Sequence, residues 1–218
     1  MNKNIFLVID FDSTIISCET LDEISNLAIK DNLEKNNKIK TLTNQAMNGE
    51  IDFTESLNQR LEILNINKSI IDKGIELIKT KISHSFIYNS NFIKKNADNI
   101  YIVSGGFIEF IRPVAEFLGI KPNHIFCNSF IKNQGRYKLD TNNVMMKNLG
   151  KVEVVKNLNI NGEVVVIGDG YTDYEIKKYG YSNIFIAYTE HVSRKKVVDL
   201  ADYRSNSFDD IIDYLSNL

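Results

Sequence analysis

The chain divides into short runs of consecutive apolar residues and longer stretches in which apolar residues recur every three or four positions. A short apolar run is typical of a strand that is buried on both faces, as in a parallel sheet. The longer periodic stretches are typical of amphipathic helices. Strands that alternate with helices predict an α/β fold with a Rossmann-like parallel sheet. The predicted strands are residues 5–9, 100–103, 125–127, 164–167 and 184–187.

Between the first and second predicted strands, every periodic signal is helical. Thr20 and Glu23 have the spacing of a capping box, which predicts that a helix begins there. We therefore expect a small helical cap at residues 16–82, inserted directly after the first strand, and an α/β core made of residues 1–15 and 83–218. The apolar stripes of the cap include Leu21, Ile24, Leu27 and Ala28; Ile39, Leu42, Ala46 and Met47; Phe53, Leu57, Leu61 and Leu64; and Ile70, Ile71, Ile75, Leu77 and Ile78.

The rest of the chain adds three helices and a hairpin to the predicted core. The helices are expected at residues 108–118, 151–158 and 209–218. Gly119 follows the first of them and is typical of a helix end. Asn133-Gln134-Gly135 predicts the turn of a small hairpin whose strands carry Phe130, Ile131 and Tyr137.

Composition places the chain among soluble globular proteins, with 43% hydrophobic and 25% charged residues. The net charge of -2 predicts no broad basic surface, so we expect no nucleic-acid partner. The first apolar run is short and is interrupted by Asp10, and no other run is long enough to span a membrane. Cys18 and Cys127 are too few for a disulfide framework, which favours reduced thiols and a cytoplasmic location. The sequence leaves open a monomer or a homodimer.

Three predicted strands end in loops that carry polar side chains. Asp10 and Asp12 follow the first strand, Ser104-Gly105 follows the second, and Asp169 and Asp173 follow a later one. Because ligands of a parallel α/β sheet bind at the carboxyl ends of its strands, we expect these loops to meet. Two carboxylates one residue apart on an extended chain point to the same side, and they repel unless a proton or a cation intervenes. The pair therefore favours a metal.

The combined loops suit phosphoryl transfer, which requires in-line positioning and neutralised phosphate oxygens. Mg²⁺ prefers oxygen ligands, and Asp10, Asp169 and the backbone carbonyl of Asp12 can supply them. A hydroxyl, a glycine N–H and a lysine at a helix start are suited to phosphate oxygens. The residues that offer these groups are Ser104, Gly105 and Lys151, with Lys147 as the alternative lysine.

Four motifs follow one another along the chain: Asp10-Phe11-Asp12-Ser13-Thr14, Ser104-Gly105-Gly106-Phe107, Lys151, and Gly168-Asp169-Gly170-x-Thr172-Asp173. They resemble the motifs of the haloacid dehalogenase superfamily, over essentially the whole chain. The resemblance implies that Asp10 is a nucleophile that forms an aspartyl-phosphate, and that Asp12 protonates the leaving oxygen and then activates water. It also implies that Asp10, Asp12 and Asp169 hold Mg²⁺, while Thr172 and Asp173 contact these residues without binding the metal or the substrate themselves.

The predicted cap extends this resemblance to one branch of the superfamily. The matching residues are Glu19-Thr20-Leu21-Asp22-Glu23, Ala46-Met47-Asn48-Gly49, Phe53, Ser56-Leu57 and Arg60. They are similar in identity and spacing to the phosphoserine phosphatase branch. The resemblance implies that Arg60 binds the substrate carboxylate, that Glu19 binds its ammonium group, and that Met47 and Phe53 wall the pocket. A guanidinium suits this role because it binds a carboxylate through two hydrogen bonds. Packing in the core is the alternative role for Met47 and Phe53.

The chain also departs from the branch at several positions. Thr172 replaces a common asparagine, residues 83–86 lack a frequent Pro-Gly, residues 187–190 lack a frequent lysine, and Lys151 lies nearer to Asp169 than is usual. The expected reaction is hydrolysis of O-phospho-L-serine to L-serine and phosphate, as in serine biosynthesis. The alternatives are hydrolysis of another small phosphomonoester, and phosphoryl transfer to an alcohol such as homoserine. A catalytically silent binding protein is disfavoured because every reactive position is filled.

Overall fold

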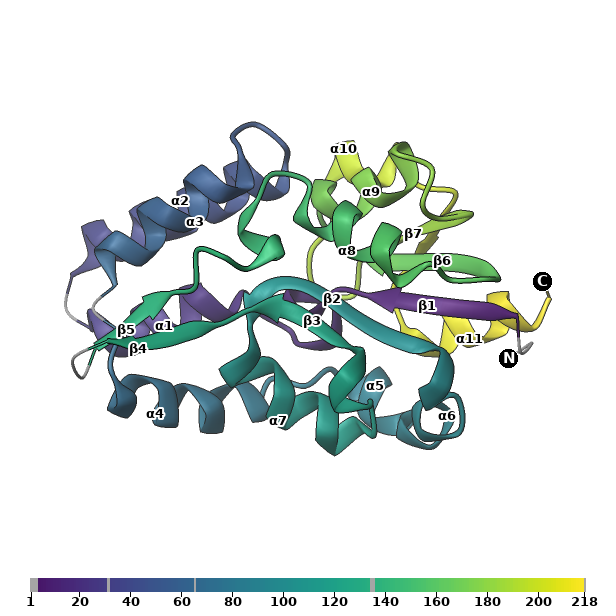
Figure 1. The fold of residues 1–218 in the computed structure, drawn as a ribbon, viewed down its shortest axis with the longest axis horizontal. Helices are drawn as coiled ribbons and strands as arrows, with labels where there is room; N and C mark the ends of the chain where they lie inside the picture. Colours follow the sequence, from purple (N-terminus) through teal and green to yellow (C-terminus); the bar gives the residue numbers. More distant parts are fainter. Residues whose placement is uncertain (1–3, 31, 65, 134–135, 218) are drawn as a thin grey trace.

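The structure is a computed structural model that describes residues 4–30, 32–64, 66–133 and 136–217. Its centre is a six-stranded parallel sheet with the strand order β3-β2-β1-β6-β7-β8 (Figure 1). The strands are β1 (Ile5–Ile9), β2 (Ile100–Phe107), β3 (Ile125–Asn128), β6 (Glu163–Gly168), β7 (Ile184–Tyr188) and β8 (Tyr203–Ser205). The parallel sheet and its intervening helices confirm the predicted α/β class.

Helices cover both faces of this sheet, as Figure 1 shows for α8 and α9 above it and α7 below it. Side chains of a strand alternate between faces, so Leu7 and Ile9 of β1 pack on one side and Val8 packs on the other. The first side is covered by α5 (His84–Tyr88), α6 (Ser90–Lys95), α7 (Ile108–Leu118) and α11 (Phe208–Ser216). The second is covered by α8 (Gly150–Leu158), α9 (Tyr171–Lys178) and α10 (Lys195–Val198).

The described part of residues 16–82, which the sequence predicts to be helical, contains α1 (Thr20–Ala28), α2 (Leu33–Met47), α3 (Phe53–Ile63) and α4 (Lys68–Lys79). Their apolar stripes share a cluster with Phe107 and Phe110 of the core. The two chain segments that lead into and out of this group run side by side. Ser17 N donates to Lys81 O at 2.8 Å, and Ser83 N donates to Ile15 O at 3.0 Å. The domain boundaries at residues 15/16 and 82/83 stay a prediction.

A hairpin extends from the core toward these helices. Its strands are β4 (Phe130–Asn133) and β5 (Arg136–Leu139), which pair antiparallel. The predicted turn residues Gln134 and Gly135 lie outside the described part of the chain. The ring of Phe130 stacks on that of Phe107 at a centroid distance of 4.0 Å. Phe130, Tyr137 and Leu139 thereby pack against the helical group.

Two local predictions need correction. β2 does not end at Val103 but continues to Phe107, so Ser104 and Gly105 lie within the strand. The helix predicted from Thr20 and Glu23 does begin at Thr20, but the capping box does not form, because Glu19 is the residue that precedes the helix and Glu23 N donates to Glu19 O at 3.1 Å. The Thr20 hydroxyl donates to Asp12.

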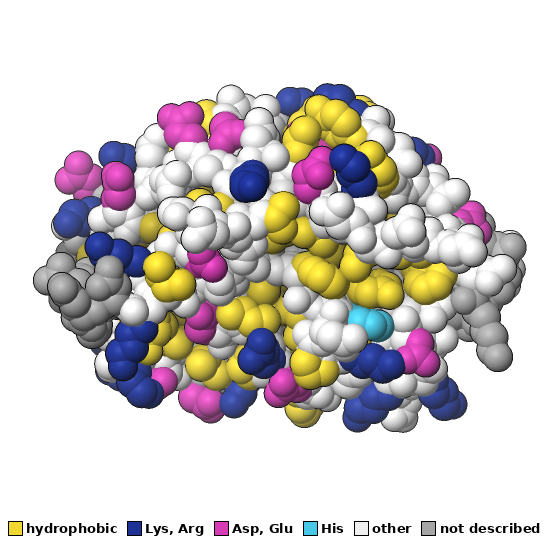
Figure 2. Space-filling view, in the orientation of Figure 1, with side chains coloured by type: hydrophobic (Ala, Val, Ile, Leu, Met, Phe, Trp, Pro, Cys, Tyr) yellow, Lys and Arg dark blue, Asp and Glu magenta, His cyan; other side chains and the backbone are white. Residues whose placement is uncertain are grey.

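The surface agrees with the charge balance of the sequence. Figure 2 shows basic and acidic side chains interspersed on the visible face. Within the described ranges, the structure has no helix that is both long enough and apolar enough to cross a membrane.

Candidate active site

The carboxyl ends of β1 and β6 bring three buried carboxylates together. Asp10 follows β1, Asp169 follows β6, and Asp173 lies in the first turn of α9, where it accepts a hydrogen bond from Gly170 N at 3.1 Å. One carboxylate oxygen from each lies within 4.8 Å of the others. The parallel register explains this placement, because Ile9 lies opposite Ile167 on the neighbouring strand.

Lys151 compensates part of this negative charge. Its Nζ lies 2.9 Å from Asp10 Oδ1 and 2.7 Å from Asp173 Oδ1, and its side chain is buried. Burial by itself lowers the pKa of Lys151, but the two carboxylates raise it above its usual value, so the ammonium group stays charged. The alternative lysine, Lys147, is exposed and lines a neighbouring cavity. The structure therefore brings Lys151, the first choice, to the carboxylates.

Asp12 occupies a different place from the other acids. Its carboxylate accepts hydrogen bonds from the backbone N–H of Thr20, at 3.1 Å, and from the Thr20 hydroxyl. It is thus outside the group of three carboxylates, although its backbone carbonyl could still serve as a ligand. Burial raises the pKa of Asp12 well above its usual value, and the negative charge of Glu19 raises it further. Such a carboxyl group is suited to carry a proton.

The predicted phosphate-binding residues of β2 lie beside these acids. Ser104 is buried, and its Oγ accepts a hydrogen bond from Gly106 N at 3.1 Å. Gly105 lies directly under the ring of Phe53, so a Cβ atom at this position would be 2.2 Å from Phe53 Cζ. Only glycine allows this approach of the ring to the backbone. The carbonyl of Gly105 accepts a hydrogen bond from Asn128 Nδ2 at 2.9 Å, a contact that the sequence did not predict.

Arg60 and Glu19, which are predicted to bind the carboxylate and the ammonium group of the substrate, line a cavity together with Asp10 and Asp12. Arg60 is 3% exposed, and its Nη1 donates to Thr43 Oγ1 at 3.1 Å. Glu19 accepts a hydrogen bond from Ser13 Oγ at 2.8 Å. The sharp turn that brings Ser13 there has a positive φ of 53° at this residue. The cavity has a volume of about 20 Å³, and its lining includes Asp10, Asp12, Glu19, Met47, Phe53, Arg60, Ser104, Gly105 and Lys151.

A larger cavity of about 310 Å³ adjoins the first one. The two cavities share Phe53, Gly105 and Lys151 in their linings. Thr172 lines the larger cavity, and its buried hydroxyl has no hydrogen-bond partner among the described residues. Most of the predicted site residues thus line the smaller cavity, and Thr172 lines the adjoining one.

Arg194 is a site residue that the sequence analysis missed. It is 8% exposed, its Nη1 lies 3.3 Å from Asp169 Oδ2, and its Nη2 lies 3.7 Å from Glu19 Oε1. Arg194 therefore places a second positive charge between Asp169, which follows β6, and Glu19, which precedes α1. In the sequence it belongs to the basic run Arg194-Lys195-Lys196, which is typical of a solvated surface.

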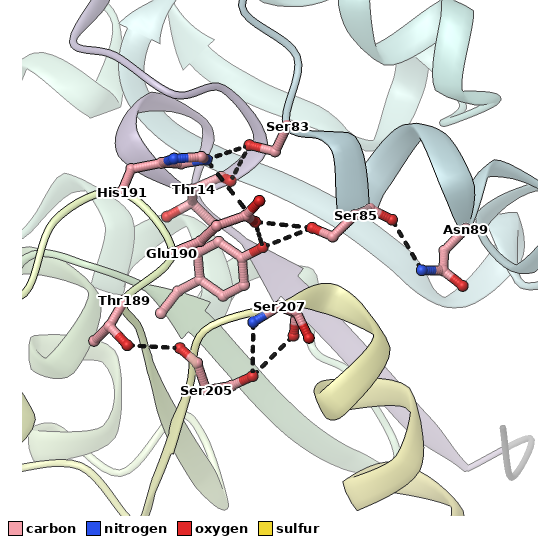
Figure 3. A network of polar contacts seen from close by, with 10 residues as sticks. Thr14, Ser83, Ser85, Asn89, Thr189, Glu190, His191, Ser205 and Ser207 are labelled. Atoms are coloured by element: carbon pink, nitrogen blue, oxygen red, sulfur yellow. Dashed lines mark hydrogen bonds and ion pairs between the residues drawn. The ribbon is translucent and has the colours of Figure 1, made fainter.

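A polar network holds the segment that carries Arg194 (Figure 3). Glu190 accepts hydrogen bonds from Ser85 Oγ, at 2.8 Å, and from the hydroxyl of Tyr188. His191 Nε2 lies 2.5 Å from Ser83 Oγ. These bonds tie the segment after β7 to the chain that leaves the helical group.

The acidic residues fit a divalent cation. Both oxygens of Asp169 are buried and receive no hydrogen bond from the described residues, and the nearest cation, Arg194, is 3.3 Å away. Burial raises the pKa of Asp169 well above its usual value, and the charges of Glu19, Asp10 and Asp173 raise it further. A bound cation would satisfy these oxygens and favour their ionised form.

Comparisons with known proteins agree with this geometry. Residues 7–176 match the family model of the haloacid dehalogenase-like hydrolases. The phosphoserine phosphatase of Methanocaldococcus jannaschii is 30% identical over 193 residues, which cover 85% of this chain and 87% of the relative. A phosphoserine phosphohydrolase-like protein from Francisella tularensis has a crystal structure that is 34% identical, with a TM-score of 0.88, and the match covers 96% of this chain and 99% of that one.

A further solved structure shows a phosphoserine phosphatase as a phospho-aspartyl intermediate analogue. It is 25% identical, with a TM-score of 0.80, and the match covers 98% of this chain and 99% of that chain.

The unsatisfied oxygens of Asp169 lead to a prediction about cation binding. Mg²⁺ should raise the melting temperature of the wild-type protein, because a ligand that binds only the folded state stabilises it. Asp169→Asn should lose most of this rise, since the amide has no negative charge to offer. Asp199→Asn, which alters an exposed ion pair with Lys195, is the matched control and should respond as the wild type does. A full wild-type response in Asp169→Asn would contradict the assignment.

Proposed function

Because the chain belongs to the haloacid dehalogenase-like hydrolase family, we propose that it is a Mg²⁺-dependent phosphatase that converts O-phospho-L-serine to L-serine and inorganic phosphate. The observation that supports this most directly is the cavity lined by Asp10, Ser104 and Lys151 as well as by Glu19 and Arg60. The first three suit a phosphoryl group, and the last two suit the two charges of an amino acid. The similarity to phosphoserine phosphatases supports the same substrate.

In the proposed reaction, a carboxylate oxygen of Asp10 attacks the phosphorus atom and the bond to the serine oxygen breaks. The products of this step are an aspartyl-phosphate and a serine whose oxygen has received a proton from Asp12. Asp12 then takes a proton from a water molecule, which attacks the phosphorus and releases phosphate and free Asp10. The raised pKa of Asp12 supports its role as the initial proton donor.

The phosphate end of the site gathers positive charge around the transferred group. Mg²⁺, held by Asp10, Asp169 and the backbone carbonyl of Asp12, would neutralise phosphate oxygens during both steps. Lys151 orients Asp10 through its contact of 2.9 Å and offers further hydrogen bonds to phosphate. Ser104 Oγ and Gly105 N–H would hold the remaining oxygens. Asp173 keeps Lys151 in place through its own contact of 2.7 Å.

The head-group end would recognise a free amino acid. Arg60 would bind the substrate carboxylate, and Glu19 would bind its ammonium group. Met47 and Phe53 would form the walls between them, since both line the cavity. The opposite charges of Arg60 and Glu19 in the lining support a zwitterionic amino-acid phosphate over a sugar phosphate or a nucleotide.

Phosphoryl transfer to an alcohol such as homoserine, or hydrolysis of another small phosphomonoester, is the second candidate. The adjoining cavity of about 310 Å³ favours the transfer reaction, because that cavity shares Phe53, Gly105 and Lys151 with the first and could admit an acceptor alcohol. Product analysis with and without candidate alcohols separates transfer from hydrolysis. A role in serine biosynthesis, a cytoplasmic location, the absence of nucleic-acid and membrane partners, and a monomeric or homodimeric state remain predictions from the sequence.

The first test is a panel of phosphomonoesters assayed with Mg²⁺. Phosphate release should be fastest from O-phosphoserine, slower from phosphothreonine and slowest from sugar phosphates. Asp10→Asn should reduce release to the background of the assay, because an amide is a poor nucleophile. Wild-type turnover by Asp10→Asn would refute the aspartyl-phosphate, and a preference for sugar phosphates would refute the substrate.

Arg60→Ala should act selectively on the amino-acid substrate. We expect kcat/KM for O-phosphoserine to fall by about 10²-fold to 10³-fold, the loss typical of a buried charged hydrogen bond. With p-nitrophenyl phosphate, which has no carboxylate, kcat/KM should change little. Arg112→Ala, on the exposed side of α7, is the matched control. Equal losses on both substrates would remove the proposed head-group pocket.

The two lysines offer a matched pair of variants. Lys151→Met should lower kcat by about 10²-fold on both substrates, because it removes a buried charge that orients the nucleophile. Lys147→Met should stay close to wild type, since its side chain is exposed. The reverse order of effects in steady-state assays would transfer the phosphate-binding role to Lys147.

A further inference from the structure

Three helices of the predicted cap are joined by polar side chains around Arg60. Arg60 on α3 donates from Nη1 to Thr43 Oγ1 on α2 at 3.1 Å. Thr43 in turn donates from Oγ1 to Asp22 Oδ1 on α1 at 2.9 Å. Thr43 is fully buried and Arg60 is 3% exposed. Figure 1 shows α2 and α3 lying side by side along their length.

The direction of these bonds follows from the groups involved. A guanidinium only donates, so the Thr43 oxygen must accept from Arg60 and use its single proton elsewhere. Two acceptors are within reach, Asp22 Oδ1 at 2.9 Å and Ile39 O at 3.1 Å. The nearer of them is a carboxylate, which is the stronger acceptor. Asp22 therefore orients the Thr43 hydroxyl so that a lone pair faces Arg60.

A second contact holds the other side of the guanidinium. Arg60 Nε lies 3.4 Å from the carbonyl of Ser56, one helical turn earlier. Ser56 is itself fixed, because its Oγ donates to Leu42 O at 2.9 Å. These bonds occupy Nε and one Nη1 hydrogen of Arg60. The remaining N–H groups are left for the cavity that Arg60 lines together with Glu19.

We propose that Thr43 and Asp22 are positioning residues that set substrate selectivity without contact with the substrate. They hold the Arg60 fork toward the place of the substrate carboxylate. Without the Thr43 hydroxyl, the guanidinium would be free to turn toward the carboxylates whose charges already act on it, Glu19 and Asp22. This inference rests on the proposed role of Arg60.

The test compares three variants of α2 on two substrates. Thr43→Val keeps the shape of the side chain and removes the hydroxyl, and Thr43→Ser keeps the hydroxyl. Thr41→Val makes the same change on the exposed side of α2, where the Thr41 hydroxyl bonds only to Asn37 O at 3.0 Å among the contacts described for it. O-phosphoserine reports on the head group, and p-nitrophenyl phosphate reports on the phosphate end alone.

Thr43→Val should raise KM for O-phosphoserine about tenfold, which corresponds to about 1.4 kcal/mol, with little change in kcat. Its kcat/KM for p-nitrophenyl phosphate should stay at the wild-type value. Thr43→Ser should restore a KM close to wild type, and Thr41→Val should match wild type on both substrates. If Thr43→Val does not fold, Thr43→Ala replaces it in the same comparison with Thr43→Ser.

A double-mutant cycle separates positioning from general stability. In an Arg60→Ala background, Thr43→Val should cause no further rise in KM, because its effect passes through Arg60. An additive rise, a wild-type KM in Thr43→Val, or equal losses on both substrates would overturn the positioning role while a selective effect of Arg60→Ala still supports the function. If Arg60→Ala itself shows no selective effect, both the proposed substrate and this inference fail.

Discussion

The repulsion between buried carboxylates is the constraint on which the rest of the site depends. Asp10, Asp169 and Asp173 place oxygens within 4.8 Å of one another at the edge of the sheet, and all three are buried. Neither desolvation nor like charge favours such a cluster. Lys151 and Arg194 compensate it from two sides, at 2.7 to 2.9 Å and at 3.3 Å. The negative charge that remains is a strong reason for a divalent cation at this point. With such a cation bound, the balance of charge would become positive and would suit a dianionic phosphoryl group.

Much of this arrangement follows from topology and could be predicted. Parallel strands end at the same edge, so acids after β1 and β6 must meet wherever the strands pair, as Ile9 and Ile167 show. The apolar runs predicted the strands correctly because helices cover both faces of the sheet, so that residues on both sides of a strand are apolar. β8 escaped prediction because Tyr203, Arg204 and Ser205 form no apolar run and are held as a strand by the neighbouring β7.

Side-chain partners were harder to predict than elements. Thr20 has the spacing of a helix cap, but the helix begins one residue earlier than that pattern requires, with Glu19 before it, and both Thr20 N and the Thr20 hydroxyl donate to Asp12. Arg194 stands in a basic run and gives no local sign that it is buried. Its position depends on the network of Glu190 and His191 with Ser85 and Ser83, which joins segments distant in the sequence. Contacts of this kind depend on tertiary packing, which no local pattern records.

The two proposed head-group residues reach the site by different routes, and this has a physical consequence. Glu19 follows Asp10 and Asp12 after one compact turn, and the bond from Ser13 at 2.8 Å fixes it to that turn. The distance between the proposed nucleophile and the proposed ammonium partner is therefore set by a short piece of chain. Arg60 lies on α3, and the bonds that orient it come from α2 and α3. If these residues act as proposed, recognition of the carboxylate would depend on where α2 and α3 lie over the sheet, whereas recognition of the ammonium group would depend mainly on the loop after β1.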